Sequence, residues 1–193
     1  MRSVTLIACL PALATALPTT STEAYKAARA LVARAPPEAK AVLKSVTSSG
    51  TGCSTNSGGF IFKDDATIAF DSMLVESTMT NPSTHCLITI DLGLDSKWKY
   101  TINKATNIRG YVDGGNAVYK VTYTAGGKTS EVSGTVKPTS DGNWAASSTS
   151  AGATSAYGGG VAGIDVTLKL NTEPGKVAAV TIDTMDVKFD YSK

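Results

Sequence analysis

Residues 85–94 read H-C-L-I-T-I-D-L-G-L, and this stretch decides the fold. Its apolar residues occupy alternate positions: Cys86, Ile88, Ile90, Leu92 and Leu94. Alternate side chains of a β-strand point to the same face, so these residues form one apolar stripe that must be buried. The stretch therefore predicts a central strand, and the other apolar segments are its expected partners.

Short apolar runs with turn signals between them surround this stretch. The predicted strands cover residues 59–62, 66–75, 98–103, 107–112, 118–125, 130–136, 164–170 and 180–191. Residues 113–116 and 126–127 are rich in glycine and are typical of hairpin turns. About eight to ten short strands at this spacing predict an all-β fold, an antiparallel two-sheet β-sandwich that is jelly-roll-like.

Two segments depart from simple alternation. In the last strand, Val180 and Ile182 share one face, but the later apolar residues fall on the other: Met185, Val187, Phe189 and Tyr191. A β-bulge near residues 183–184 would bring both sets to the core. Residues 144–163 are rich in Ala, Ser, Thr and Gly, so we expect a mobile loop there, with one short edge strand near Trp144.

The sequence divides into three parts. Residues 1–16 predict a secretory signal peptide, with Arg2 before a short apolar core and a small-x-small cleavage site. Residues 17–48 predict a helical pro-region or linker, because residues 23–33 favour a helix. This segment is either a loosely attached stalk or a helix packed on the domain. Residues 49–193 form the predicted β-sandwich domain.

Composition excludes several classes of partner. The chain is 42% hydrophobic and 18% charged, with a formal net charge of +2. This charge gives no electrostatic reason to expect nucleic acid or an anionic membrane as a partner. No apolar run after the leader is long enough to span a bilayer. We expect a secreted monomer that binds no cofactor.

Cleavage of the leader removes Cys9 and leaves Cys53 and Cys86. In an oxidising compartment two cysteines most simply pair, so a structural disulfide is predicted. The alternative is a reactive thiol or a metal site with His85. One histidine and two cysteines do not complete a four-ligand zinc site without carboxylates, so the sequence favours the disulfide and predicts no metal.

Several motifs occur in an order that is similar to one family. They are residues 50–53 (G-T-G-C), 66–71 (A-T-I-A-F-D), 85–92 (H-C-L-I-T-I-D-L), 98–102 (W-K-Y-T-I) and 109–112 (R-G-Y-V). Together they resemble the secreted fungal family catalogued as domain of unknown function 4360, over roughly residues 46–191. The resemblance implies a secreted, all-β, disulfide-bearing domain without an assigned activity. His85 replaces the family's usual Asn, and the family's later cysteine pair is absent.

Candidate catalytic groups are few. Asp91 lies on the polar face of the central strand, and a glycosidase would need a second carboxylate about 5–10 Å away. His85 is the only histidine, and no G-x-S-x-G motif accompanies it. Asp186 and Asp190 share a strand face, but no calcium-binding loop motif is present. The sequence therefore predicts no catalytic residue.

Aromatic residues offer the other route to a function, because sugars stack on exposed rings. Trp144 and Tyr157 lie in polar, flexible surroundings and are the candidate ligand-binding residues. We expect a secreted, non-enzymatic protein that interacts with an extracellular protein or a cell-wall glycan. A carbohydrate-binding module is the alternative, and a glycan hydrolase that uses Asp91 is the third possibility.

Overall fold

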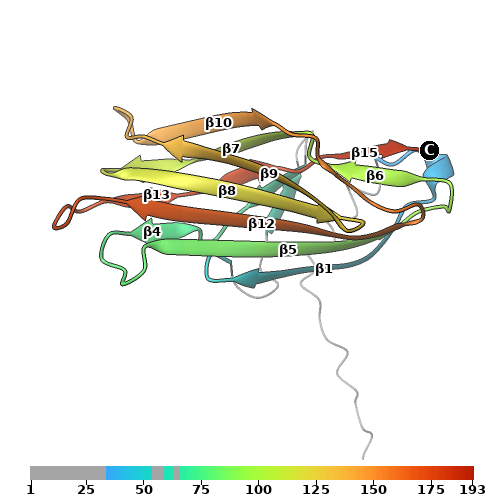
Figure 1. Cartoon of the computed structure of the whole chain (residues 1–193), viewed down its shortest axis with the longest axis horizontal. Coiled ribbons are helices and arrows are strands. Elements are labelled where there is room, and N and C mark those ends of the chain that lie inside the picture. Colours follow the sequence, from blue (N-terminus) through green and yellow to red (C-terminus); the bar gives the residue numbers. More distant parts are fainter. Residues whose placement is uncertain (1–33, 54–58, 63–65) are drawn as a thin grey trace, which may run out of the picture.

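The computed structural model describes residues 34–53, 59–62 and 66–193, and the protein is an antiparallel β-sandwich (Figure 1). One sheet has the order β1 (Val42–Gly50), β5 (Ser83–Gly93), β12 (Gly159–Asn171), β8 (Asn116–Ala125) and β9 (Lys128–Val136). A 3-10 turn, η1 (Pro37–Ala39), precedes it. The all-β, antiparallel fold class is confirmed.

The second sheet packs against the first and is built from shorter strands. Its order is β2 (Gly59–Phe62), β3 (Ala66–Ala69), β14 (Thr184–Asp186), β7 (Ala105–Asp113), β13 (Ala179–Thr181) and β4 (Leu74–Glu76), and β10 (Asn143–Thr149) pairs with β7. A third, small sheet consists of β11 (Ala153–Thr154), β6 (Lys99–Ile102) and β15 (Phe189–Ser192).

The predicted apolar stripe is the centre of the core. Cys86, Ile88, Ile90 and Leu92 are at most 1% exposed. Ile88 pairs with Ile164 of β12, where every second residue is also buried. Since one face of each strand carries the apolar residues and the other carries polar ones, the sheet can bury one face and expose the other. This alternation fixes the register across β5, β12 and β8.

The predicted bulge is confirmed. Val180 pairs with Val112 of β7, whereas Thr184 pairs with Arg109, so four steps along one strand correspond to three along the other. The extra residue reverses the alternation. Val180 before the bulge and Met185 after it are both fully buried, so the apolar residues on either side of the bulge face the core.

The disulfide prediction is also confirmed. Cys53 and Cys86 are bonded, with 5.4 Å between their Cα atoms. The backbone N–H of Gly52 donates to the carbonyl of His85 at 2.8 Å, which holds the chain beside β5 as it leaves β1. Both cysteines are buried, so the link joins the start of the domain to its central strand from the inside.

The structure corrects two predictions, one about a segment boundary and one about a loop. Residues 42–48 belong to β1 and pair with β5, so the sheet begins inside the segment predicted as a helical pro-region or linker. Most of residues 144–163 lie in β10, β11 and β12, so the mobile loop is wrong, whereas the short edge strand expected near Trp144 is confirmed as β10. The predicted signal peptide and the helix at residues 23–33 lie outside the described residues.

Candidate functional site

The structure separates the two aromatic residues that the sequence grouped. Trp144 is 8% exposed and stacks on Tyr119, with ring centroids 5.9 Å apart. Its Nε1 donates to the carbonyl of Thr181 at 3.2 Å. Gly110 allows this approach, because a Cβ there would lie 2.9 Å from the indole nitrogen. The prediction that Trp144 stands in flexible surroundings is therefore wrong, since it is a packed part of the second sheet.

Tyr157 is exposed, as expected, at 59%. Its ring centroid lies 5.0 Å from the Nζ of Lys99. It precedes β12, whereas Trp144 begins β10, and these two strands start at opposite ends of the sandwich (Figure 1). One ligand of ordinary size cannot contact both residues, so they do not form a common site.

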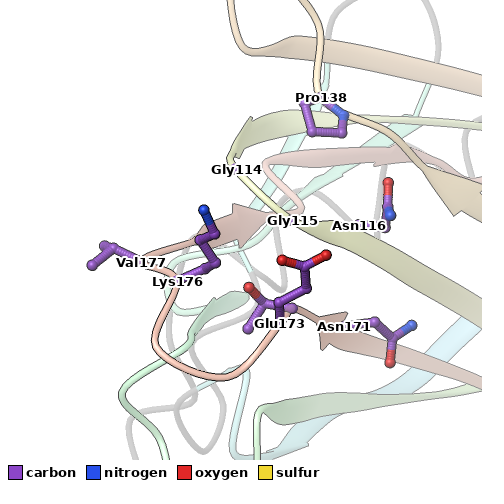
Figure 2. Close-up of a pocket in the computed structure, with 9 residues that line it drawn as sticks. Gly114, Gly115, Asn116, Pro138, Asn171, Glu173, Lys176 and Val177 are labelled. Atoms are coloured by element: carbon purple, nitrogen blue, oxygen red, sulfur yellow. The ribbon is translucent and has the colours of Figure 1, made fainter.

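A concave site lies instead at the end of the sandwich where three connections meet (Figure 2). We call it the loop-end pocket. Its volume is about 540 Å³. The β7–β8 hairpin, the β9–β10 loop and the β12–β13 loop supply its lining: Gly114, Gly115, Asn116, Pro138, Asn171, Thr172, Glu173, Lys176 and Val177.

The register between β8 and β12 places two of the polar side chains of this pocket next to each other. Asn116 and Asn171 are the last pair of the β8–β12 ladder, so their side chains leave the same face of the sheet next to each other. Gly114 and Gly115 have φ values of +66° and +64°, which turn the hairpin sharply. A Cβ on Gly114 would approach the carbonyl of Val177 to 2.9 Å, so the hairpin and the β12–β13 loop touch because glycine is present.

The polar side chains of the pocket have no partners within the described residues. Asn116, Asn171, Glu173 and Lys176 form no side-chain hydrogen bond or ion pair there. The Oγ1 of Thr172 is buried and also lacks a partner in the part of the chain that the structure covers. Figure 2 shows the side chain of Glu173 directed toward Gly115 and Asn116, with Pro138 across the opening. The exposed side chains of Asn116, Asn171, Glu173 and Lys176 are available to a ligand.

The candidate catalytic and metal groups do not converge in the same way. Asp91 points away from the core and lies 3.8 Å from the Nζ of Lys44. Asp186 accepts a hydrogen bond from Asn107 on the second sheet, whereas Asp190 lies near Lys104 and Lys188 on the small sheet. Within the described ranges, no three His, Cys, Asp or Glu residues are grouped so that they could hold a metal ion.

The fold and the pocket define a disulfide-linked, two-layer β-sandwich with a polar pocket at one end. The chain belongs to the family described as Domain of unknown function (DUF4360), whose model matches residues 39–192. No curated protein matches it. No helix of the described segments is long and apolar enough to cross a membrane.

Several solved structures show a weak similarity to this chain. TmCBM61 in complex with β-1,4-galactotriose is 11% identical with a TM-score of 0.34, and the match covers 76% of this chain and 88% of that one. The CBM36-1 domain of a xylanase from the hindgut metagenome of Trinervitermes trinervoides is 14% identical with a TM-score of 0.32, covering 74% and 94%. The carbohydrate-binding module CBM28 is 7% identical with a TM-score of 0.34, covering 69% and 79%. At these values none of the three indicates the function of this chain.

Proposed function

We propose that this protein is a secreted, non-enzymatic binding domain that holds a neutral carbohydrate in the loop-end pocket. The observation that carries the proposal is the convergence of Asn116, Asn171, Glu173 and Lys176 without partners among the described residues. A carboxamide both donates and accepts hydrogen bonds, as a sugar hydroxyl does. One carboxylate and one ammonium group cancel in formal charge, which favours an uncharged ligand.

The position of the pocket supports binding. Its side chains stand on short connections held by a rigid two-layer scaffold, the usual arrangement of binding residues in β-sandwich proteins. Pro138 and Val177 add apolar surface at the rim, and Val177 is 87% exposed. The pocket therefore offers hydrogen-bonding groups next to apolar surface, and a sugar ring has both characters.

The absence of catalysis is part of the proposal. A glycosidase needs two carboxylates that face each other across its cleft. Glu173 is the only acidic residue among the described residues that line the pocket. We expect no release of reducing ends when the protein is incubated with the glycans that it binds. Turnover that disappears in Asp91→Asn or Glu173→Gln, with folding intact, would show that the protein is an enzyme.

Secretion is the third part of the proposal. The buried Cys53–Cys86 disulfide supports a protein that matures in an oxidising compartment. We expect the protein in the culture medium of its host, with an N-terminus near residue 17. Retention inside the cell with residues 1–16 uncleaved would contradict this part.

The binding proposal is tested with a glycan array followed by calorimetric titration of the glycans that respond. The double variant Asn116→Ala/Asn171→Ala should lower the affinity about tenfold or more, because it removes hydrogen bonds at the centre of the site. Asn81→Ala is the matched control, since Asn81 is an exposed Asn outside the loop-end pocket. No response to any glycan, or equal loss in both variants, would overturn the proposal.

A further inference from the structure

A second hollow lies on the outer face of the second sheet. We call it the Arg109 groove, and its volume is about 440 Å³. Arg109 and Gly110 of β7, Asn143 and Trp144 of β10, and Asp183 line it. Trp144 is buried and its ring stacks on Tyr119 of the first sheet, so this residue borders the hollow without forming an exposed platform.

Arg109 is open to a ligand from both sides. In the ladder its neighbours are Ala145 of β10 and Thr184 of β14, which are both small. Its guanidinium forms no ion pair or hydrogen bond with any described residue. Asp183 lines the same groove, and its Oδ1 accepts a hydrogen bond from Thr181 at 2.7 Å. A guanidinium and a carboxylate together suit an uncharged ligand that both accepts and donates hydrogen bonds.

Tyr111 lies between the groove and the loop-end pocket, with an orientation set by its neighbours. It is 45% exposed and pairs with Asn143. A Cβ on Gly142 would lie 2.1–2.8 Å from atoms of the Tyr111 ring and hydroxyl, so the ring packs directly on the glycine backbone. Val112 donates to the carbonyl of Gly142 at 2.7 Å, which holds this turn in place. One side of the ring is therefore supported, and a large part of it faces solvent.

The same two chain segments line both hollows. The β9–β10 connection supplies Pro138 to the pocket, and Asn143 follows it in the groove. Along β7 and its hairpin, Arg109 lies in the groove and Gly114 lies in the pocket. At about 3.4 Å per residue, the five steps between them span roughly 17 Å along the chain. Two chain segments, residues 109–114 and 138–143, therefore run from one hollow to the other.

We propose that the loop-end pocket and the Arg109 groove are two subsites of one site for an unbranched, neutral oligosaccharide that crosses Tyr111. This inference rests on the proposed function and specifies its ligand as a chain rather than a single sugar. Tyr111 supplies a ring on which a sugar stacks between the subsites. Arg109, Asn143 and Asp183 provide hydrogen bonds to the distal unit.

Length dependence tests the proposal. The probes are cello-, chito- and β-1,3-gluco-oligosaccharides of two to six units, titrated by calorimetry. Affinity should rise at least about tenfold between two and six units in the series that binds, because the longer chain reaches the second subsite. Tyr111→Ala should remove most of this rise and leave the affinity for the disaccharide nearly unchanged. Tyr157→Ala, an exposed tyrosine at the other end of the sandwich, is the matched control.

Tryptophan fluorescence gives a second readout. The chain has two tryptophans, so Trp98→Phe leaves Trp144 in the groove wall as the only emitter. We expect the hexasaccharide to change its emission and the disaccharide to leave it unaltered. Binding that is independent of chain length, with unchanged emission and no effect of Tyr111→Ala, would overturn the two-subsite inference while the single-pocket function stands. Failure of all three series to bind, together with no response on the glycan array, would overturn both.

Discussion

The two ends of the sandwich differ in what their polar groups contact. At the end that carries β6, β11 and β15, which we call the paired end, polar groups bond to one another (Figure 1). Asn103 is fully buried there, donates to Tyr123 at 3.1 Å and to the carbonyl of Asp186 at 2.8 Å, and accepts from the N–H of Lys188. Tyr100 likewise donates to the carbonyl of Gly160 at 2.9 Å.

At the loop end the carboxamides of Asn116 and Asn171 lack such bonds among the described residues. A satisfied buried network stabilises the fold, whereas exposed groups without partners contribute little to stability and remain open to a ligand. For polar side chains, the comparison therefore assigns stability to the paired end and binding to the loop end. Substituting polar residues at the paired end should lower stability and keep affinity, whereas substituting them at the loop end should lower affinity and keep stability.

The largest expected change in stability comes from removing the disulfide, which lies in the half of the sheet nearer the loop end. Removing it in Cys53→Ala/Cys86→Ala should lower the free energy of unfolding by about 3–4 kcal/mol, since its cysteines are 33 residues apart in the sequence. Urea denaturation measures the change. Dithiothreitol should destabilise the wild type and leave the double variant unaffected.

Hydrogen exchange locates the effect of that variant. Protection should fall mainly in β1 and at the start of β5, where the link holds the chain, and less in β6 and β15. An equal loss of protection at both ends would show that the link stabilises the whole sandwich evenly, and the distinction between the ends would not extend to their stability.

Asn103→Ala tests the paired end directly. The variant leaves the Lys188 N–H and the Asp186 carbonyl without their partner, and alanine tolerates the φ of +43° less well than asparagine does. We expect a loss of about 3 kcal/mol in the free energy of unfolding. Thermal and urea unfolding should agree on it. Glycan affinity of the folded fraction should stay at the wild-type value, and a large affinity loss would contradict the division of roles.

Alkaline pH probes the same end without mutation. Burial raises the pKa of Tyr100 and of Tyr123, and raises that of Tyr191 to about 12. A tyrosine with a folded-state pKa above its unfolded value near 10 favours the protonated form in the folded protein. Its contribution to stability is therefore complete below about pH 10 and is lost as the pH rises toward 12.

The free energy of unfolding should accordingly fall between about pH 10 and 12, by up to about 1.4 kcal/mol per pH unit for each such tyrosine, and the melting temperature should fall with it. Tyr191→Phe should reduce the slope. A pH profile that is identical in wild type and Tyr191→Phe would show that other groups control the alkaline transition.

The same contrast explains what the sequence could predict. Alternation predicted the core of β5 and β12 because each strand buries one face, so the pattern records burial residue by residue. The bulge near residues 183–184 could be predicted for the same reason, since apolar side chains changed face. The disulfide followed from counting cysteines in an oxidising compartment.

Segments held mainly by backbone pairing could not be predicted in this way. In β10 only Trp144 is buried and the other side chains are polar or small, so the sequence predicted a short strand near Trp144 but not its extent. Residues 42–48 carry few apolar side chains and were expected to be a helix or linker, yet they pair with β5. Edge strands of this kind depend on their neighbours more than on their own sequence.

The pocket residues lacked a signal for another reason. The turn composition near Asn116 and Glu173 predicted loops, but residues 55 positions apart meet only because Asn116 pairs with Asn171 in the β8–β12 ladder. Strand order sets that contact, and single-sequence patterns do not determine which strands become neighbours. For Trp144 the sequence was misleading rather than silent. Its polar neighbours in the sequence indicated an exposed side chain, but the indole packs against Gly110.

The smallest expected change in stability completes the comparison. Asn171→Ala should alter the free energy of unfolding by no more than about 0.5 kcal/mol, because an exposed side chain without an internal partner leaves nothing unsatisfied when it is removed. The same substitution should weaken glycan binding, while Asn103→Ala weakens the fold. Urea denaturation measures the free energy of unfolding of both variants, and calorimetric titration measures their glycan affinity. If Asn171→Ala proved as destabilising as Asn103→Ala, the loop-end carboxamide would be structural, and the pocket would lose the property that makes it a binding site.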